Sequence, residues 1–184
     1  ALTKIGRPAG KTPRPAATSL DRGRETQCAA TIELVVIGLS TGGPTALEQT
    51  LPKLPADFAV PVLIVQHMPK LFTGALAERL NKSCRLRVQE GYEGAIVRPG
   101  TIWIAPGDSH MEIAPQKTML GEPANGGRIR LHRQAPLNHC MPAVDYLFFS
   151  AARMYGAGAL ALVMTIPLLR FLPPDDPRGR ATGD

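Results

Sequence analysis

The sequence predicts an α/β fold, a doubly wound and mainly parallel three-layer sheet with an inserted β-hairpin region. Short apolar runs rich in β-branched residues alternate with amphipathic stretches of helical period. The apolar runs are typical of strands buried on both faces. The β-α-β-α order implies right-handed crossovers with helices covering the sheet. With 184 residues, 44% of them hydrophobic, the chain is long enough for one domain with a substantial core.

Residues 1–31 have the composition of a flexible, basic linker rich in Pro and Gly. The first 27 residues contain six Lys or Arg and two acidic residues, a net +4 of the formal +6 of the chain. The rest shows no basic stripe interleaved with aromatic residues, the usual mark of a nucleic-acid surface. We therefore expect a tether at this end and no nucleic-acid partner.

Two βα units are expected after the linker. "IELVVIG" (32–38) is predicted to be a buried strand, and "GGPTALEQTLPKL" (42–54) a helix with one proline at its first position and another that breaks it. "VPVLIVQH" (60–67) follows as a second buried strand, and "FTGALAERLNKSC" (72–84) as a second amphipathic helix.

The middle of the chain changes to short strand-like pieces divided by Gly and Pro. These pieces are "LRVQE" (86–90), "GTIWIAPG" (100–107), "SHMEIAP" (109–115) and "RIRLH" (128–132). We expect them to form the β-hairpin region inserted between the α/β units.

The doubly wound pattern resumes with a helix over 141–156 and a third buried strand over 159–165. Residues 166–184 contain four prolines and have neither a helical nor a strand period, so they cannot supply the helix and strand expected next. The predicted organisation is therefore a linker, a folded domain over 32–165 and an irregular tail, with the C-terminal part of the fold incomplete. The third strand would then lack a covering helix and expose Leu160, Leu162 or Met164.

Residues 38–42, "GLSTG", fit the G-x-S-x-G pattern of a nucleophile elbow, and they lie between a strand and a helix as that motif requires. Such a turn raises the Ser40 hydroxyl at the carboxyl edge of the sheet. The backbone N–H groups of Thr41 and the helix start would then face developing negative charge. A phosphate-binding loop and a plain glycine turn remain alternatives, although the Walker lysine and the G-x-G-x-x-G spacing are absent.

His67 is the candidate base for Ser40, since a serine hydroxyl is a weak nucleophile without a base in hydrogen-bond reach. His67 closes the second strand as Ser40 closes the first. If these strands are neighbours, about 4.8 Å apart, the two side chains can meet at the edge where open α/β sheets bind ligands. The alternative is a strand-end histidine bonded to a loop carbonyl.

No metal or cofactor site is predicted. His110 and Glu112 have no third ligand at useful spacing, and His132 and His139 are expected to be solvated or local, with substrate contact an option for His139. Three cysteines without CxxC spacing indicate free thiols in a reducing compartment. Because there is neither a signal-peptide core nor an apolar run of about 20 residues, we expect a cytoplasmic protein without membrane insertion.

Five segments within 32–165, in order and with consistent spacing, resemble the catalytic domain of the chemotaxis protein-glutamate methylesterases. They are "IGLSTGGPTAL", "VQHMP", "FTGALAERLN", "GTIWIAPGDSHMEI" and "MPAVDYLFFSAA". The resemblance implies a doubly wound sheet with a hairpin insertion, and a linker that in the family follows a phosphorylatable receiver domain, which we therefore expect upstream of residue 1. The implied substrates are glutamyl methyl esters and certain glutamines on methyl-accepting chemotaxis receptors of a two-component pathway.

The resemblance also implies roles at the site: Ser40 as nucleophile, His67 as general base and the Thr41 N–H as one oxyanion donor. The family continues with "GMGNDG", whose aspartate orients the histidine and whose methionine supplies a second oxyanion N–H. By count, the aspartate position is Arg170, and the methionine position is Pro167, which has no N–H. The departure predicts impaired turnover.

Two functional hypotheses follow. The first is a serine hydrolase of the methylesterase type with low activity, and the second is a catalytically inactive homologue or fragment that at most binds receptor helices. A shifted reading frame would account for residues 166–184. A nucleotide-binding module on the glycine loop has little support, since the specific nucleotide motifs are missing.

Overall fold

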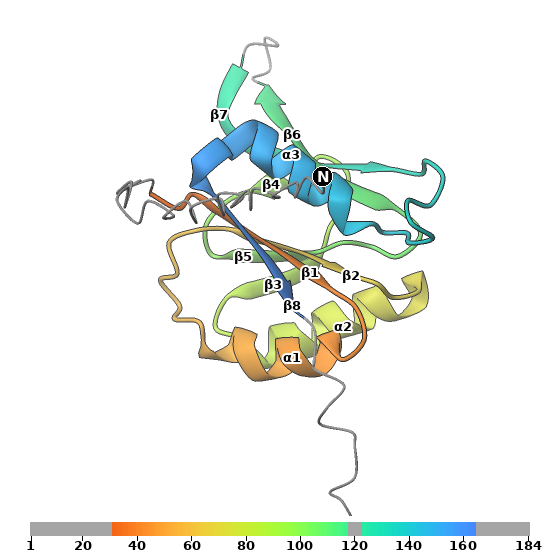
Figure 1. Ribbon diagram of the computed structural model, residues 1–184. Coiled ribbons are helices and arrows are strands. Elements are labelled where there is room, and N and C mark those ends of the chain that lie inside the picture. The colour runs from red at the N-terminus through yellow and green to blue at the C-terminus, as the bar shows by residue number, and fades with distance from the viewer. Residues whose placement is uncertain (1–30, 118–122, 165–184) are drawn as a thin grey trace, which may run out of the picture.

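Residues 31–117 and 123–164 are described by the computed structural model, and they form layers of helix and sheet (Figure 1). The strands are β1 (Leu34–Leu39), β2 (Val62–Gln66), β3 (Arg87–Glu90), β4 (Ile96–Val97), β5 (Thr101–Ile104), β6 (His110–Lys117), β7 (Pro123–His132) and β8 (Ala159–Met164). The helices are α1 (Gly43–Thr50), α2 (Lys70–Ser83) and α3 (Val144–Tyr155), with 3-10 turns at Leu51–Lys53 and Gly156–Gly158.

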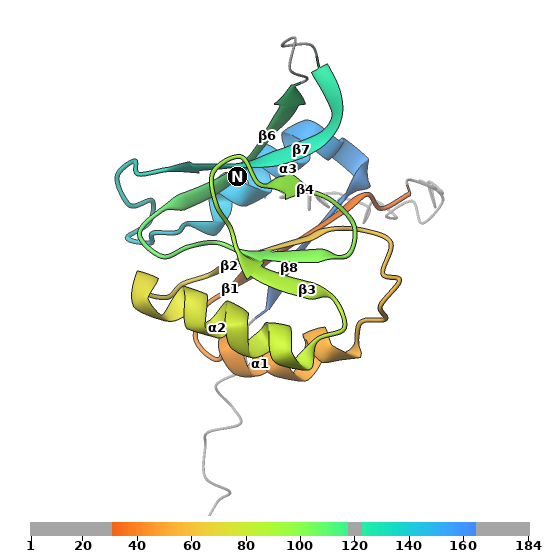
Figure 2. The same ribbon diagram turned by 180° about the vertical axis from the view of Figure 1, so that it is seen from behind.

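The larger sheet is parallel throughout, with the strand order β3-β5-β2-β1-β8. From β1 the chain moves to one side through β2, and it returns on the other side of β1 as β8. Helices α1 and α2 lie on one face of this sheet, while α3 and the smaller antiparallel sheet β4-β7-β6 lie on the other (Figures 1 and 2). The predicted doubly wound, three-layer α/β class is confirmed.

Two hydrophobic clusters hold the layers together, one on each face of the parallel sheet. Alternate residues of β1 belong to different clusters: Val35, Ile37 and Leu39 pack toward α1 and α2, whereas Leu34 and Val36 pack toward α3 and the antiparallel sheet. Each fully buried aliphatic side chain contributes about 1.5–3 kcal/mol. This two-sided burial explains why the strand appears in the sequence as a continuous apolar run.

The predicted hairpin region is only partly right. Strands β3 and β5, at "LRVQE" and "GTIWIAPG", belong to the parallel sheet, where they pair with each other and β5 pairs with β2. The separate sheet consists of β4, β6 and β7, in which β6 and β7 form the hairpin. Gly- and Pro-containing turns divide all of these strands alike, so the sequence does not reveal which sheet each one joins. Strand β7 also begins earlier than predicted, at Pro123.

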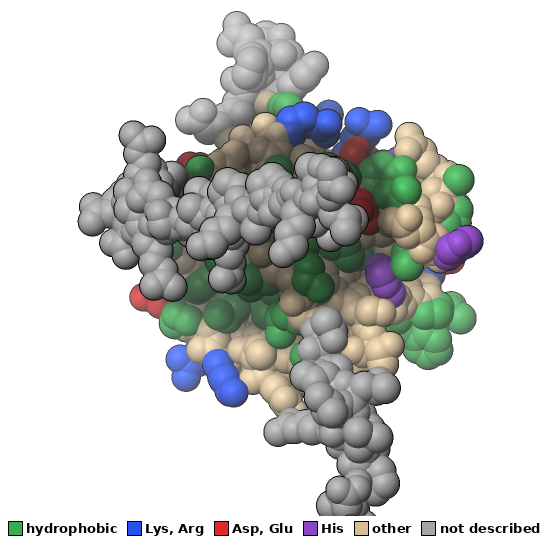
Figure 3. Space-filling model, in the orientation of Figure 1, with side chains coloured by type: hydrophobic (Ala, Val, Ile, Leu, Met, Phe, Trp, Pro, Cys, Tyr) green, Lys and Arg blue, Asp and Glu red, His purple; other side chains and the backbone are tan. Residues whose placement is uncertain are grey.

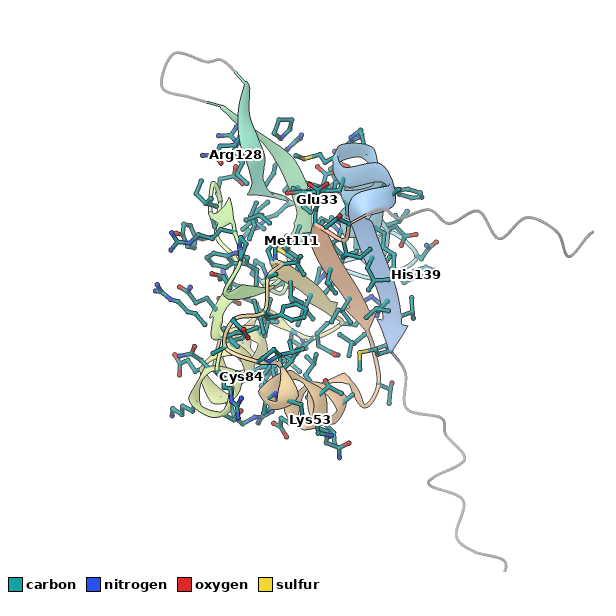
Figure 4. All side chains as sticks on the ribbon, turned by 90° about the vertical axis from the view of Figure 1, so that its left-hand side faces the viewer. Glu33, Lys53, Cys84, Met111, Arg128 and His139 are labelled. Atoms are coloured by element: carbon teal, nitrogen blue, oxygen red, sulfur yellow. The ribbon has the colours of Figure 1, made fainter. Side chains whose placement is uncertain are left out.

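Strand β8 lies where the third strand was predicted, but the prediction that it is buried is wrong. Within the described residues it pairs on one side only, with β1, and it runs along the edge of the sheet (Figure 4). Leu160, Leu162 and Val163 are 40%, 38% and 71% exposed, while Met164 is half-buried against the α1 and α2 side of the core. The expected exposure of Leu160 and Leu162 is thus confirmed.

The ends of the helices agree with local signals in the sequence. Pro44 lies in the first turn of α1, and Pro52 lies in the 3-10 turn that follows Thr50. Helix α3 ends at Gly156, whose φ of 50° falls in the left-handed region that favours glycine. Helix α2 begins at Lys70, slightly before the predicted start. No helix in 31–117 or 123–164 is both long and apolar enough to span a membrane.

Gly38 of β1 lies against Val144 of α3 and provides a test of this packing. A Cβ at Gly38 would lie 2.6 Å from Cγ1 of Val144, well inside contact distance. We expect Gly38→Ala to lower the free energy of unfolding by about 1–3 kcal/mol, the usual effect of overpacking. Urea unfolding followed by circular dichroism measures the change. Adding Val144→Ala should recover part of the loss, and simple additivity of the two effects would contradict the assigned clash.

Candidate active site

Ser40 is the first residue after β1 and lies exposed on the turn into α1. The Gly43 N–H donates to the Ser40 carbonyl at 2.9 Å and closes this turn. Gly42 caps the helix with a φ of 78°, a conformation that glycine adopts without strain. Thr41, the predicted oxyanion donor, is exposed on the same turn. The segment therefore has the strand–turn–helix geometry of a nucleophile elbow.

His67 follows β2 as Ser40 follows β1, and the structure brings these two predicted residues to adjacent strand ends. Leu39 and Gln66 are register partners in the parallel pairing, and the His67 N–H donates to the Leu39 carbonyl at 3.1 Å. His67 is half-buried. Within the part of the chain that the structure describes, no hydrogen bond joins the Ser40 hydroxyl to the His67 ring. Catalytic hydrogen bonds are often long without substrate and tighten when it binds.

Gln66 ties the two strand ends together, a role that the sequence did not reveal. Its Nε2 donates to the carbonyls of Ser40 at 3.0 Å and of His67 at 3.1 Å, and the residue is 2% exposed. Its Oε1 is buried without a hydrogen-bond partner. A Cβ at Gly43 would lie 1.7 Å from that oxygen, so glycine at position 43 makes room for the carboxamide. The only signal in the sequence is an amide side chain ending a buried strand.

The imidazole of His67 contacts a thiol. Its Nδ1 lies 3.7 Å from Sγ of Cys140, a half-buried residue in the loop over 133–143. Sequence reasoning assigned the cysteines only as free thiols, and Cys84 and Cys140 are both free in the structure. The contact joins residues 73 positions apart, so no local pattern could have indicated it.

His110 anchors this loop from the first position of β6. It is fully buried; its Nδ1 accepts the Ala143 N–H at 3.1 Å, and its Nε2 lies 3.3 Å from the Ala135 carbonyl. Because the Ala143 N–H requires an acceptor at Nδ1, the ring proton belongs on Nε2, which donates to Ala135. His110 therefore has a structural role on both sides of the loop. Its ring also packs against that of Tyr146, with a centroid distance of 4.4 Å and an angle of 46° between the ring planes.

His132 lies beside His110 and Glu112, so of its two predicted settings, solvated or local, the structure shows the local one. Its Nε2 is 3.7 Å from Glu112 Oε2, and its buried Nδ1 has no partner. Burial lowers the pKa of His132, with His110 and Arg130 acting in the same direction and Glu112 opposing them. Among residues 31–117 and 123–164, no three His, Cys, Asp or Glu side chains are grouped as metal ligands.

His139 is exposed on a turn, where its φ is 62°.

A mainly apolar groove of about 420 Å³ adjoins His67 on the α2 side. It is lined by Pro44, His67, Met68, Pro69, Phe72, Ala75, Leu76 and Arg79. Arg79 forms an ion pair with Glu48 of α1. At the start of α2, Leu71 and Phe72 are 87% and 57% exposed, and Figure 3 shows apolar side chains gathered on this part of the surface. The candidate base thus borders a surface suited to an apolar partner.

Comparison with known proteins decides the family. The CheB methylesterase family profile matches residues 35–166. The chain belongs to this family. A protein-glutamate methylesterase/protein-glutamine glutaminase of Trichodesmium erythraeum is 43% identical over 152 residues, which are 82% of this chain and 41% of that protein. One of the same name from Desulfotalea psychrophila is 45% identical over 133 residues, 72% of this chain and 35% of that protein.

A solved structure supports the same assignment. The CheB methylesterase catalytic domain of Thermotoga maritima matches with a TM-score of 0.67 and 38% identity, over 73% of this chain and 68% of that one. The chain spans about two fifths of the length of the curated relatives that it matches. In this CheB methylesterase family member, residues 1–30 of the predicted linker over 1–31 lie outside the described residues, as do the tail positions Pro167 and Arg170.

The bridge made by Gln66 predicts different effects for two substitutions of similar size. Gln66→Glu places an acceptor-only carboxylate against two carbonyl oxygens, and we expect it to lower the free energy of unfolding by about 3–5 kcal/mol, as an uncompensated buried charge does. Gln66→Met keeps the shape and should cost less, about 1–3 kcal/mol for the two lost hydrogen bonds, since the Ser40 carbonyl still accepts the Gly43 N–H. Urea unfolding at pH 8 compares them. Equal losses would mean that the bridge contributes only packing.

The lowered pKa of His132 predicts a pH-dependent loss of stability. The unfolded chain takes up a proton at this residue near pH 6.5, whereas the folded chain does so only at lower pH. The stability that neutral His132 provides is therefore present above pH 6.5 and is lost as the pH falls toward its folded pKa. Urea unfolding from pH 8 to pH 5 should show this slope in the native chain and a shallower one in His132→Gln. Identical slopes would contradict the prediction.

Proposed function

We propose that the chain is a serine hydrolase domain that cleaves glutamyl methyl esters, and deamidates glutamines, on chemotaxis receptors. The observation that carries the proposal is the position of Ser40 and His67 after paired strands β1 and β2, in a member of the CheB methylesterase family. The names of the relatives in Trichodesmium erythraeum and Desulfotalea psychrophila support the substrate class. We place this activity on the cytoplasmic helices of methyl-accepting receptors.

The proposed reaction is acyl transfer through Ser40. His67 takes the proton of the Ser40 hydroxyl, and Oγ attacks the ester carbonyl carbon. The Thr41 N–H donates to the oxyanion of the tetrahedral intermediate. As the intermediate collapses, methanol leaves with the proton from His67. In the second step His67 takes a proton from a water molecule, which attacks the acyl carbon. His67 then returns the proton to Ser40 Oγ as the glutamate is released. With a glutamine substrate the leaving group is ammonia.

The proposal includes slow turnover. By sequence count, Arg170 stands where the family has the aspartate that orients the histidine, and Pro167 stands where it has the second oxyanion donor. Loss of the aspartate in a Ser-His-Asp set lowers kcat about 10⁴-fold, and loss of one oxyanion donor lowers it about 10²–10³-fold. Both positions lie outside the described residues, so this part of the proposal depends on the sequence alone.

A second candidate function, receptor binding without turnover, is favoured by the groove beside His67. Exposed Leu71 and Phe72 and the apolar groove lining would contact a receptor helix whether or not Ser40 reacts. A receiver domain upstream of the linker, and the absence of a nucleic-acid partner, remain predictions from the sequence.

Acylation and turnover can be measured separately. We expect a fluorophosphonate probe to label the chain once, with the label found on Ser40 by mass spectrometry, lost in Ser40→Ala and retained in the exposed control Ser83→Ala. Methanol release from membranes with methylated receptors should be close to the Ser40→Ala background, because His67 lacks its orienting aspartate in both steps. The fluorophosphonate label is irreversible, so it accumulates even when Ser40 reacts slowly.

The outcomes separate the candidates. Absence of Ser40-dependent labelling contradicts the hydrolase proposal, and co-sedimentation with the same membranes would then favour receptor binding. Methanol release well above the Ser40→Ala background contradicts slow turnover.

A further inference from the structure

Cys140 is the side chain that the structure places against Nδ1 of the candidate base. The 3.7 Å separation between Sγ and Nδ1 is hydrogen-bonding distance for sulfur. Both residues are half-buried, so water competes for this contact less than it would on an exposed surface.

The loop that carries Cys140 is fixed at its tip. Leu137 and Cys140 exchange two backbone hydrogen bonds, from the Leu137 N–H at 3.2 Å and from the Cys140 N–H at 2.9 Å. Between them, Asn138 and His139 have φ of 51° and 62°, the conformation of a two-residue type I′ turn. Cys140 therefore leaves the turn in a fixed direction.

The base of the loop is fixed by His110. This fully buried ring bonds to Ala135 on one limb and to Ala143 on the other. A rigid tip on an anchored base holds the thiol in place independently of the contact with His67. The contact is thus built into the fold of the loop.

A histidine that takes a proton at Nε2 must carry its own proton on Nδ1, and the group that accepts from Nδ1–H sets this tautomer. We propose that Cys140 is a positioning residue for His67, whose sulfur accepts the Nδ1–H hydrogen bond and keeps Nε2 free for the Ser40 proton. The catalytic part of this inference rests on the proposed function, whereas the tautomer of His67 does not depend on that function. A thiol is a weak acceptor, so the orientation is weaker than a carboxylate would give.

A substitution series at position 140 separates hydrogen bonding from packing. Cys140→Ala removes the acceptor, Cys140→Ser keeps a polar acceptor of similar size, and Cys140→Asp supplies a charged one whose oxygens extend one bond beyond the sulfur position. Cys84→Ala is the matched control, because Cys84 is the other free thiol of the described residues and lies at the C-terminal end of α2.

The measurement is ¹⁵N–¹H NMR of the full chain labelled at histidine, with the His67 ring assigned by its absence in His67→Asn. We expect neutral His67 to be mainly the Nδ1–H tautomer. In Cys140→Ala the tautomer ratio should move about fivefold toward Nε2–H, as expected for loss of one weak hydrogen bond. In Cys140→Asp the Nδ1–H form should increase, the ring should stay protonated to higher pH, and methanol release should exceed that of the native chain.

The tautomer readout distinguishes failure of this inference from failure of the proposed function, since it needs no substrate. A His67 ring that is mainly Nε2–H in the native chain, or a ratio that is the same in the native, Ala and Asp forms, overturns the role of Cys140. If the Nδ1–H fraction of His67 increases from Cys140→Ala to the native chain to Cys140→Asp, but Ser40 is not labelled, the role of Cys140 as the hydrogen-bond acceptor is supported and the hydrolase proposal is contradicted. An unchanged ratio in Cys84→Ala is expected, and an equal shift there would overturn the assignment to Cys140.

Discussion

The parallel register of β1 with β2 is the constraint on which the candidate site depends. Because Leu39 is paired with Gln66, the next residues along each strand, Ser40 and His67, reach the same edge of the sheet. The same register directs the Gln66 carboxamide inward, where it bonds to both strand ends. A slip of one residue would turn Gln66 to the other face and break both bonds. Side chains of β1 packed on both faces make such a slip costly.

The antiparallel sheet contributes to the site through the loop that it supports. His110 begins β6 and bonds to Ala135 and Ala143, and Cys140 reaches His67 from between these two points. Both sheets therefore contribute to the site. The parallel sheet carries Ser40 and His67 at its strand ends, and the inserted sheet supports the loop that places the Cys140 thiol against Nδ1 of His67. This arrangement gives the insertion a role at the candidate site in addition to covering one face of the core.

The sequence predicted the features that depend on local pattern. Periodicity located β1, β2, α1, α2, α3 and β8. The G-x-S-x-G motif and a strand-end histidine indicated Ser40 and His67 as candidates, and the structure places these two residues at adjacent strand ends. Features that depend on distant partners were not predictable: β3 and β5 look like hairpin strands until their parallel partners are known, and β8 looks buried although only β1 pairs with it among the described residues. Gln66 and Cys140 likewise acquire meaning only from contacts 26 and 73 residues away.

The bridge made by Gln66 has a consequence for how this fold can diverge. The carboxamide bonds to main-chain carbonyls of residues 40 and 67, not to their side chains. Every amino acid carries such a carbonyl, so the support is indifferent to which side chains stand at the two positions. The bridge by itself therefore places no requirement on the side chains at positions 40 and 67, and a substitution that removes the nucleophile or the base leaves both of its hydrogen bonds in place.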